Sequence, residues 1–82
     1  MHEAALALSL LSIVLKEAET VGANRVLSIT VQAGEYAAIN EYALTFAWEI
    51  AAKGTAAAGA QLLLQAYPGS RDLIIESMEV QK

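Results

Sequence analysis

Residues 25–34 read RVLSITVQAG, and this stretch decides the fold. Its apolar residues, several of them β-branched, roughly alternate with small or polar ones, and the run stops at Gly34, so it predicts a β-strand. Residues 3–20, which come before it, are good helix formers; Glu3 suits the positive end of a helix dipole, and Gly22 follows as a stop signal. We therefore expect a helix followed by a strand.

A second helix and two more strands are expected further along the chain. Asn40 is a suitable N-cap for a helix over residues 41–53, and Gly54 closes that helix. This helix carries Tyr42, Leu44, Phe46, Trp48 and Ile50, so it is expected to supply the aromatic part of the core, with Trp48 and Phe46 as core residues. The remaining strands are predicted over residues 60–67 and 72–80.

Pro68 and Gly69 separate the last two predicted strands and suit the central positions of a type II turn. A hairpin is the simplest connection between these strands. The order helix, strand, helix, strand, strand predicts an α/β (α+β) fold, in which two helices pack on one face of a three-stranded mixed sheet. The strand, helix, strand unit is expected to be a right-handed crossover. The sequence leaves the strand order open.

Length and composition predict one domain and argue against nucleic acid as a partner. The 82 residues contain one proline and no obvious linker, so a single domain over residues 1–82 is expected. The net charge is −4, and the five basic residues are scattered rather than clustered, which does not suit binding to phosphates. Because the chain has no cysteine, it offers no disulfide framework and no thiolate site for zinc.

The apolar run over residues 4–15 raises the question of a membrane segment. A helix needs about 20 apolar residues to span a bilayer, and this run is shorter and is bracketed by Glu3 and Lys16. A signal peptide would carry a basic region ahead of the run, where this chain has His2 and Glu3. We therefore expect no membrane association and a cytoplasmic protein.

The first predicted helix is apolar on two sides. At about 100° per residue, one stripe suits the core and consists of Leu6, Leu10, Ile13 and Val14. A second strip on the opposite side consists of Leu8, Leu11 and Leu15, extended by Ala4 and Ala18. One sheet cannot cover two opposite faces, so the second strip predicts either a contact with a partner or a loop folded over it, and we favour the contact.

The predicted strands show the same excess of apolar residues in milder form. If Ile29 and Val31 point into the core, Leu27 is not expected to point outward, whereas Leu63 and Ile74 fall on the solvent face. The predicted interface, with a second copy or with a protein partner, comprises Leu8, Leu11, Leu15, Leu63 and Ile74.

Several segments resemble the nickel-insertion accessory proteins of hydrogenase and urease maturation, the HypA/HybF family. They are, in chain order, Met1-His2-Glu3, GANRVLSITVQAGEY, ALTFAWEIAAKGT, GAQLLLQA and LIIESMEV. The most specific points are Met1-His2-Glu3, Gly34-Glu35 and Lys53-Gly54-Thr55. The resemblance covers essentially the whole chain in order.

The chain departs from the family in two ways. The family carries a zinc domain with two CxxC pairs between the last two strands, where this chain has only YPGSRD at residues 67–72. We therefore expect no zinc. The family also tends to be polar where this chain has the leucines and isoleucine of the predicted interface. Together these departures suggest a trimmed and resurfaced nickel-binding domain, natural or engineered.

The amino terminus offers donors that suit nickel. The Met1 amine, the His2 amide nitrogen and the His2 ring nitrogen can close adjacent chelate rings around one ion, and the Glu3 amide or carboxylate can complete four positions. A planar, nitrogen-rich set suits Ni(II) or Cu(II) better than zinc. The resemblance implies that His2 is the nickel ligand with Glu3 beside it. It also implies a possible second shell at Asn40 and Glu41, and a maturation GTPase as a possible partner.

Catalysis has no support in the sequence, because there is no cysteine, the one histidine is close to the amino terminus and no serine lies in a nucleophile elbow. Two hypotheses remain. The first is a nickel-binding metallochaperone domain for hydrogenase or urease maturation. The alternative is a natural or engineered self-assembling module that uses the scaffold without delivering metal.

Overall fold

The computed structural model describes residues 2–82 and contains the five elements in the predicted order. Every predicted boundary lies within one residue of the observed one. The elements are α1 (Glu3–Thr20), β1 (Arg25–Gly34), α2 (Glu41–Ala52), β2 (Gln61–Tyr67) and β3 (Leu73–Gln81).

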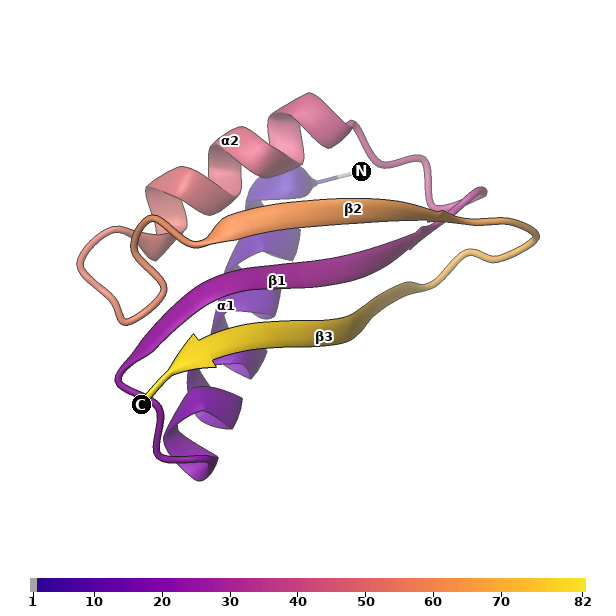
Figure 1. Ribbon diagram of the computed structural model, residues 1–82. Helices are drawn as coiled ribbons and strands as arrows, with labels where there is room; N and C mark the ends of the chain where they lie inside the picture. Colours follow the sequence, from indigo (N-terminus) through magenta and orange to yellow (C-terminus); the bar gives the residue numbers. More distant parts are fainter. Residues whose placement is uncertain (1) are drawn as a thin grey trace.

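The sheet has the strand order β2-β1-β3, so β1 lies in the centre (Figure 1). β1 pairs in parallel with β2 and antiparallel with β3, which confirms the predicted mixed sheet. α1 lies behind the sheet in Figure 1, and α2 runs along the side of β2. Both helices share a single apolar core with the inner face of the sheet.

The predicted hairpin between β2 and β3 is wrong, because β1 lies between them. The turn itself is present: Gly69 has a φ of 74°, which suits a glycine. The connection passes across the end of β1 and is held there by backbone hydrogen bonds. Gly34 N donates to Asp72 O at 2.8 Å, and Tyr36 N donates to Ser70 O at 2.8 Å. The turn motif predicted the local conformation and not the pairing.

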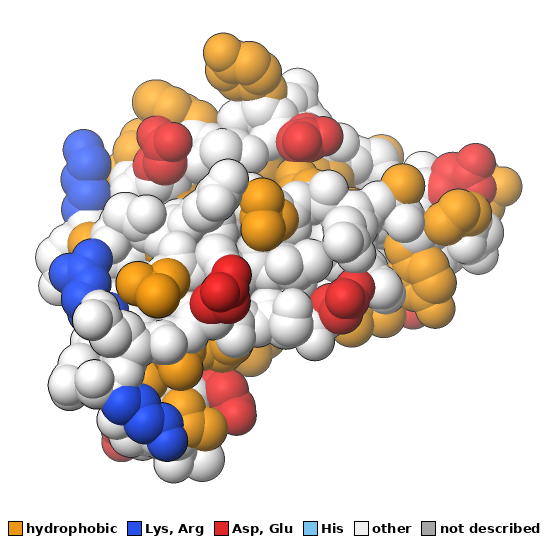
Figure 2. Space-filling view, viewed as in Figure 1, with side chains coloured by type: hydrophobic (Ala, Val, Ile, Leu, Met, Phe, Trp, Pro, Cys, Tyr) orange, Lys and Arg blue, Asp and Glu red, His pale blue; other side chains and the backbone are white. Residues whose placement is uncertain are grey.

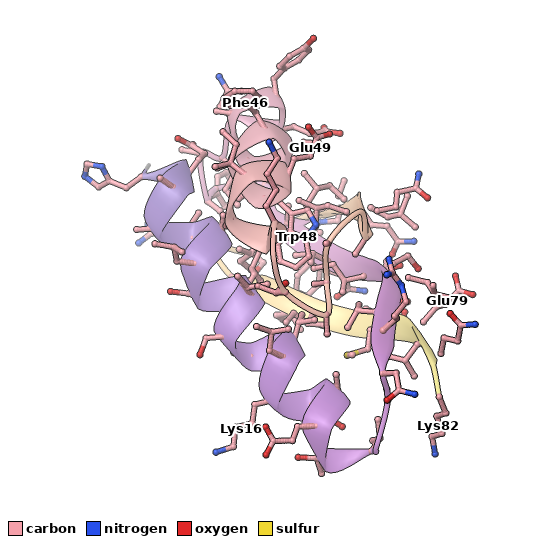
Figure 3. The ribbon with its side chains drawn as sticks, turned by 90° about the vertical axis from the view of Figure 1, so that its left-hand side faces the viewer. Lys16, Phe46, Trp48, Glu49, Glu79 and Lys82 are labelled. Atoms are coloured by element: carbon pink, nitrogen blue, oxygen red, sulfur yellow. The ribbon has the colours of Figure 1, made fainter. Side chains whose placement is uncertain are left out.

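Trp48 lies in the centre of the core, as predicted. Its side chain is fully buried, and its indole N–H donates to the carbonyl oxygen of Ala60 at 2.9 Å. The core prediction is wrong for Phe46, which is 62% exposed, and also for Tyr42 and Ile50, which are 88% and 53% exposed. Trp48 and Phe46 lie on different sides of α2, which Figure 3 shows from the end of the sheet. Only one of them can face the sheet.

The prediction of two opposite apolar faces on α1 is also wrong. At about 100° per residue, Ala7 and Ala18 lie between the two strips of larger residues, and both alanines are fully buried. The buried face of α1 therefore draws on both strips; it consists of Ala7, Leu10, Leu11, Val14 and Ala18. α1 buries such a wide face because it packs against α2 as well as against the sheet.

The residues at the two margins of this face remain partly or largely in solvent. Leu6 and Leu15 are half-buried, whereas Leu8 is 59% and Ile13 57% exposed. The assignment of Ile13 to the core is therefore wrong, as is that of Leu11 to an uncovered strip. No helix within residues 2–82 is long and apolar enough to cross a membrane.

The outer face of the sheet carries isolated apolar side chains. Leu63 and Ile74 are exposed, as the alternation predicted. Leu27 is also exposed, against the prediction, because the pairing of β1 with β3 shifts between Val26 and Ser28 and interrupts the alternation. Figure 2 shows this face with apolar side chains scattered among acidic ones.

Gly34 provides a test of the connection between β2 and β3. A Cβ atom at this position would lie 2.5 Å from the carbonyl oxygen of Ser70 and 2.8 Å from that of Asp72. Both neighbours are backbone atoms, so Gly34→Ala is expected to lower the free energy of unfolding by about 2–4 kcal/mol. Urea denaturation measures this change.

Gly59→Ala is the matched control. Gly59 has a φ of 76°, and nothing lies within 4 Å of an added Cβ, so only backbone strain of about 1–2 kcal/mol is expected. If Gly34→Ala proved no more destabilising than this control, the connection would not be held against β1 as described.

Candidate metal centre at the amino terminus

The first turns of α1 and α2 are joined by one carboxylate. The backbone N–H of Asn40 donates to Glu3 Oε2 at 3.1 Å. The Asn40 side chain caps α2, as predicted, because its Oδ1 accepts from Ala43 N at 3.0 Å. Glu3 belongs to the first turn of α1, and Asn40 immediately precedes α2. Glu3 therefore connects residues that are far apart in the sequence and fixes the start of α1 against the start of α2.

The electrostatics of this contact favour the ionised form of Glu3. The pKa of Glu3 is lowered, first by the hydrogen bond from the Asn40 N–H and then by one from its own backbone N–H. Both N–H groups lie at helix amino termini, where unpaired N–H groups and the helix dipole attract an anion. A negative charge is thereby held directly beside His2.

The predicted ligands differ in how far the structure describes them. Met1 lies outside the described residues. His2 is exposed and precedes α1 with φ −88° and ψ 87°, and its side chain makes no capping hydrogen bond. Glu3 is half-buried. Within residues 2–82 there is no group of three His, Cys, Asp or Glu side chains that could hold a metal ion. A site here would therefore require backbone and amino-terminal nitrogens together with the imidazole.

The two predicted second-shell residues take different positions. Asn40 uses its side chain to cap α2, so its link to this site is the backbone N–H that binds Glu3. Glu41 is exposed in the first turn of α2, and the hydrogen bonds of the described residues include none to its carboxylate. The sequence identified Asn40 as a cap, but it gave no sign that its N–H would bind Glu3.

The five residues predicted as an interface do not form one surface. Leu11 is buried in the core, and Leu15 is half-buried. Leu8 is exposed on α1, whereas Leu63 and Ile74 are exposed on strands of the sheet. The proposed strip is thus largely covered by the chain's own core.

The family model for HypA, described as hydrogenase/urease nickel incorporation, metallochaperone, matches residues 1–79. The chain belongs to the HypA family. This family is one of metallochaperones rather than of catalysts.

Individual relatives agree with the family match. The hydrogenase maturation factor HypA of Methanopyrus kandleri is 39% identical over 69 residues, which are 84% of this chain and 49% of the relative. That of Deinococcus radiodurans is 36% identical over 69 residues, which are 84% of this chain and 58% of the relative. The chain thus spans about half the length of these HypA relatives.

Two solved structures have the same fold. The solution structure of the Ni metallochaperone HypA from Helicobacter pylori has a TM-score of 0.74 at 16% identity, covering 100% of this chain and 95% of that one. A second HypA solution structure has a TM-score of 0.71 at 17% identity, covering 100% of this chain and 93% of that one. At these identities the likeness concerns the arrangement of two helices on a mixed sheet.

Three short segments carry the most specific resemblance to the HypA family, and two of them, Gly34-Glu35 and Lys53-Gly54-Thr55, stabilise turns. Glu35 Oε1 accepts from Gly69 N at 3.0 Å and so holds the connection between β2 and β3. Thr55 Oγ1 donates to Ala52 O at 2.7 Å and accepts from Ala57 N at 3.0 Å, which closes the turn after α2. Met1-His2-Glu3 is then the remaining segment of the three that could bind a metal ion.

The lowered pKa of Glu3 predicts how stability should depend on pH. Its folded pKa lies below the unfolded value of about 4.3, so its contribution is present above that pH and is lost as the pH falls through the folded pKa. Glu3→Gln keeps an oxygen that accepts from Asn40 N but removes the charge. The metal-free parent chain should therefore exceed Glu3→Gln in stability at pH 7, and the difference should shrink below about pH 4.

Urea denaturation across this pH range measures the difference. Glu76→Gln is the control, because Glu76 also accepts a hydrogen bond, from Gln32 Nε2 at 2.8 Å, but on the exposed sheet. A constant difference between the parent chain and Glu3→Gln from pH 7 to pH 3 would contradict the role given to Glu3.

Proposed function

We propose that this chain is a nickel-binding metallochaperone domain that serves hydrogenase or urease maturation in the cytoplasm. The single observation that carries the proposal is the fixed start of α1, where Glu3 binds Asn40 N and leaves His2 exposed beside it. Membership of a family described by nickel incorporation supports the choice of metal. Nickel is the cargo of such a protein and not a resident cofactor.

The proposed ligands are the Met1 amine, the His2 amide nitrogen and the His2 imidazole, with Glu3 completing the set through its amide or carboxylate. Adjacent five- and six-membered chelate rings favour binding by one short segment. Such a set suits Ni(II) or Cu(II), which accept square-planar nitrogen ligands, better than zinc, which prefers a tetrahedral site. The proposal includes no zinc site, because the 82 residues contain no cysteine.

The contact between Glu3 and Asn40 gives the proposed site a preferred orientation. A free amino-terminal tripeptide would lose backbone freedom on binding nickel, at a cost of about 1–2 kcal/mol per residue. In this chain Glu3 is already ordered by α1 and by the Asn40 N–H. Less freedom is then lost when nickel binds, and the negative charge of Glu3 favours the cation.

Transfer of nickel requires a second protein. The resemblance implies a maturation GTPase in this role, and the partner surface is proposed to lie near the exposed amino-terminal site, where bound nickel could be passed on. The alternative function, a self-assembling module that uses the leucine strip of α1, is weakened because Leu11 belongs to the chain's own core.

The nickel proposal predicts one binding site per chain in a calorimetric titration with Ni(II) at pH 7.5. His2→Ala should abolish binding, because the chain has no other histidine. A residue added before Met1 should abolish it as well, because the amine would become an amide. Affinity should also fall in acid, since nitrogen ligands bind a metal ion only in their deprotonated form.

Circular dichroism of the variants provides the folding control. His2 is exposed and makes no capping bond, so His2→Ala should retain the helix content of the parent chain. Nickel binding that persists at unchanged affinity in His2→Ala would reject the site.

Glu3 should act on nickel affinity mainly by positioning the ligands. Glu3→Ala removes the acceptor for Asn40 N and should weaken nickel binding by about 10–100-fold, the usual effect of removing a supporting hydrogen bond. Glu3→Gln keeps the acceptor and should weaken binding less. The chemical shift of the Asn40 amide reports on the contact independently of the metal. Equal losses in both variants, with an unchanged Asn40 shift, would contradict positioning.

A further inference from the structure

The sheet has an open edge at β3. The strand order β2-β1-β3 makes β2 and β3 the two edge strands. α2 runs along the side of β2, whereas no other element within residues 2–82 runs alongside β3 (Figure 1). An uncovered edge strand of nine residues presents a row of unpaired backbone groups, which is a template for pairing with another extended segment.

One backbone hydrogen bond shows which groups of β3 point away from the sheet. The carbonyl oxygen of Gln81 accepts from Asn24 N at 2.8 Å, so the backbone of Gln81 points toward the side of β1. Successive residues of a strand present their N–H and C=O groups to alternate sides. The N–H and C=O groups of Val80 and Met78 therefore point to the open edge, and those of Glu79 point to β1.

The two faces of β3 differ in character. Met78 and Val80 are half-buried, and their side chains pack against the core. Glu76 and Glu79 are exposed, and their carboxylates accept hydrogen bonds from uncharged side chains of β1. Figure 3 shows Glu79 on the outer side of the sheet, away from α1. The open edge is thus apolar toward the core and negatively charged on the outer face.

α1 extends beyond this edge on the core side of the sheet. It crosses behind the strands, and its C-terminal half reaches past β3 (Figure 1). Leu8 lines a groove against α2, so the opposite flank of α1 faces away from α2. Ile13 lies on that flank and is 57% exposed. A strand added beside β3 would therefore have the apolar side chain of Ile13 beneath it.

We propose that residues 77–81 of β3, together with Ile13, are a docking surface for an extended segment of a partner protein. This segment adds a fourth strand to the sheet by pairing with the backbone of Met78 and Val80. Its side chains alternate: apolar ones pack on Ile13 and extend the core, and Lys or Arg residues face the carboxylates of the outer face. The proposal does not depend on nickel binding.

The charge on the outer face favours a basic segment over a second copy of this chain. Pairing two β3 strands would bring Glu76 and Glu79 of both copies onto the same face, and like charges across neighbouring strands are destabilising. The net charge of −4 on each copy adds to the repulsion. A segment that carries Lys or Arg turns the same carboxylates into attractive partners.

A synthetic peptide of about seven residues, in which valine and lysine alternate, tests the proposal. It should bind the metal-free chain with a dissociation constant on the order of 100 μM to 1 mM, because a single short strand buries little surface. Amide hydrogen exchange, followed by NMR, should slow at Met78 and Val80 and stay unchanged at Glu79. This alternation distinguishes an added strand from ion pairing alone. A peptide with glutamate in place of lysine should not bind.

Val80→Pro tests the backbone pairing. Proline is tolerated in an edge strand where the N–H faces solvent, so the variant should fold, and circular dichroism checks this. Loss of the N–H should weaken binding of the lysine peptide about tenfold. Val80→Ala is the matched control, because it also removes side-chain packing but keeps the N–H, and it should retain most of the affinity.

Side-chain variants test the two faces. Ile13→Asn should weaken binding of the lysine peptide, whereas Leu8→Asn should not, because Leu8 is 59% exposed on the flank of α1 that faces α2. Glu79→Gln keeps an acceptor for its partner on β1 but removes the charge. It should weaken binding about two- to fivefold, the usual value of a cross-strand ion pair.

Several outcomes would overturn the proposal. They are no binding of the lysine peptide at about 5 mM, binding that slows exchange at Glu79 as much as at Met78 and Val80, and equal affinity for the glutamate peptide. Equal affinities of folded Val80→Pro and Val80→Ala would also contradict it. If exchange at Met78 and Val80 slowed with increasing concentration of the peptide-free chain, a second copy would be the occupant, and the proposal would again be overturned.

Discussion

The whole structure depends on β1 being paired along both of its edges. β1 is parallel to β2 on one side and antiparallel to β3 on the other, so it is the element that joins them into one sheet. Its inward residues Val26, Ile29 and Val31 are buried and provide the surface on which the helices pack. At its end, Gly34 must lack a side chain because the connection between β2 and β3 passes directly over it. Burial and backbone pairing thus coincide in this one strand.

The helices add a second constraint, which concerns the amino terminus. α1 packs against both α2 and the sheet, so its buried face is wide, and the position of its first turn relative to α2 is fixed. Glu3 and Asn40 meet there. The proposed nickel site follows from this packing, because the core determines where His2 lies although His2 itself contributes nothing to the core.

The residues that carry the family resemblance divide into two kinds. Glu35 and Thr55 hold turns by hydrogen bonds, and their roles are complete within the fold. His2 has no such structural role in the described residues, because its side chain is exposed and makes no capping bond. His2 is not needed for the fold and lies beside the negative charge of Glu3, so it is a better candidate for a metal ligand than Glu35 or Thr55.

The sequence by itself determined the elements, their boundaries, the cap at Asn40 and the local turn at Gly69, because each depends on neighbours within a few residues. It also offered the donors of the proposed site, since these are adjacent in the chain. Only the tertiary structure decided that β1 separates β2 from β3, that Leu11 is buried while Ile13 and Phe46 are exposed, and that Asn40 N binds Glu3. These outcomes depend on which surfaces meet, and helix periodicity fixes the angle between side chains but not the direction from which a neighbour covers them.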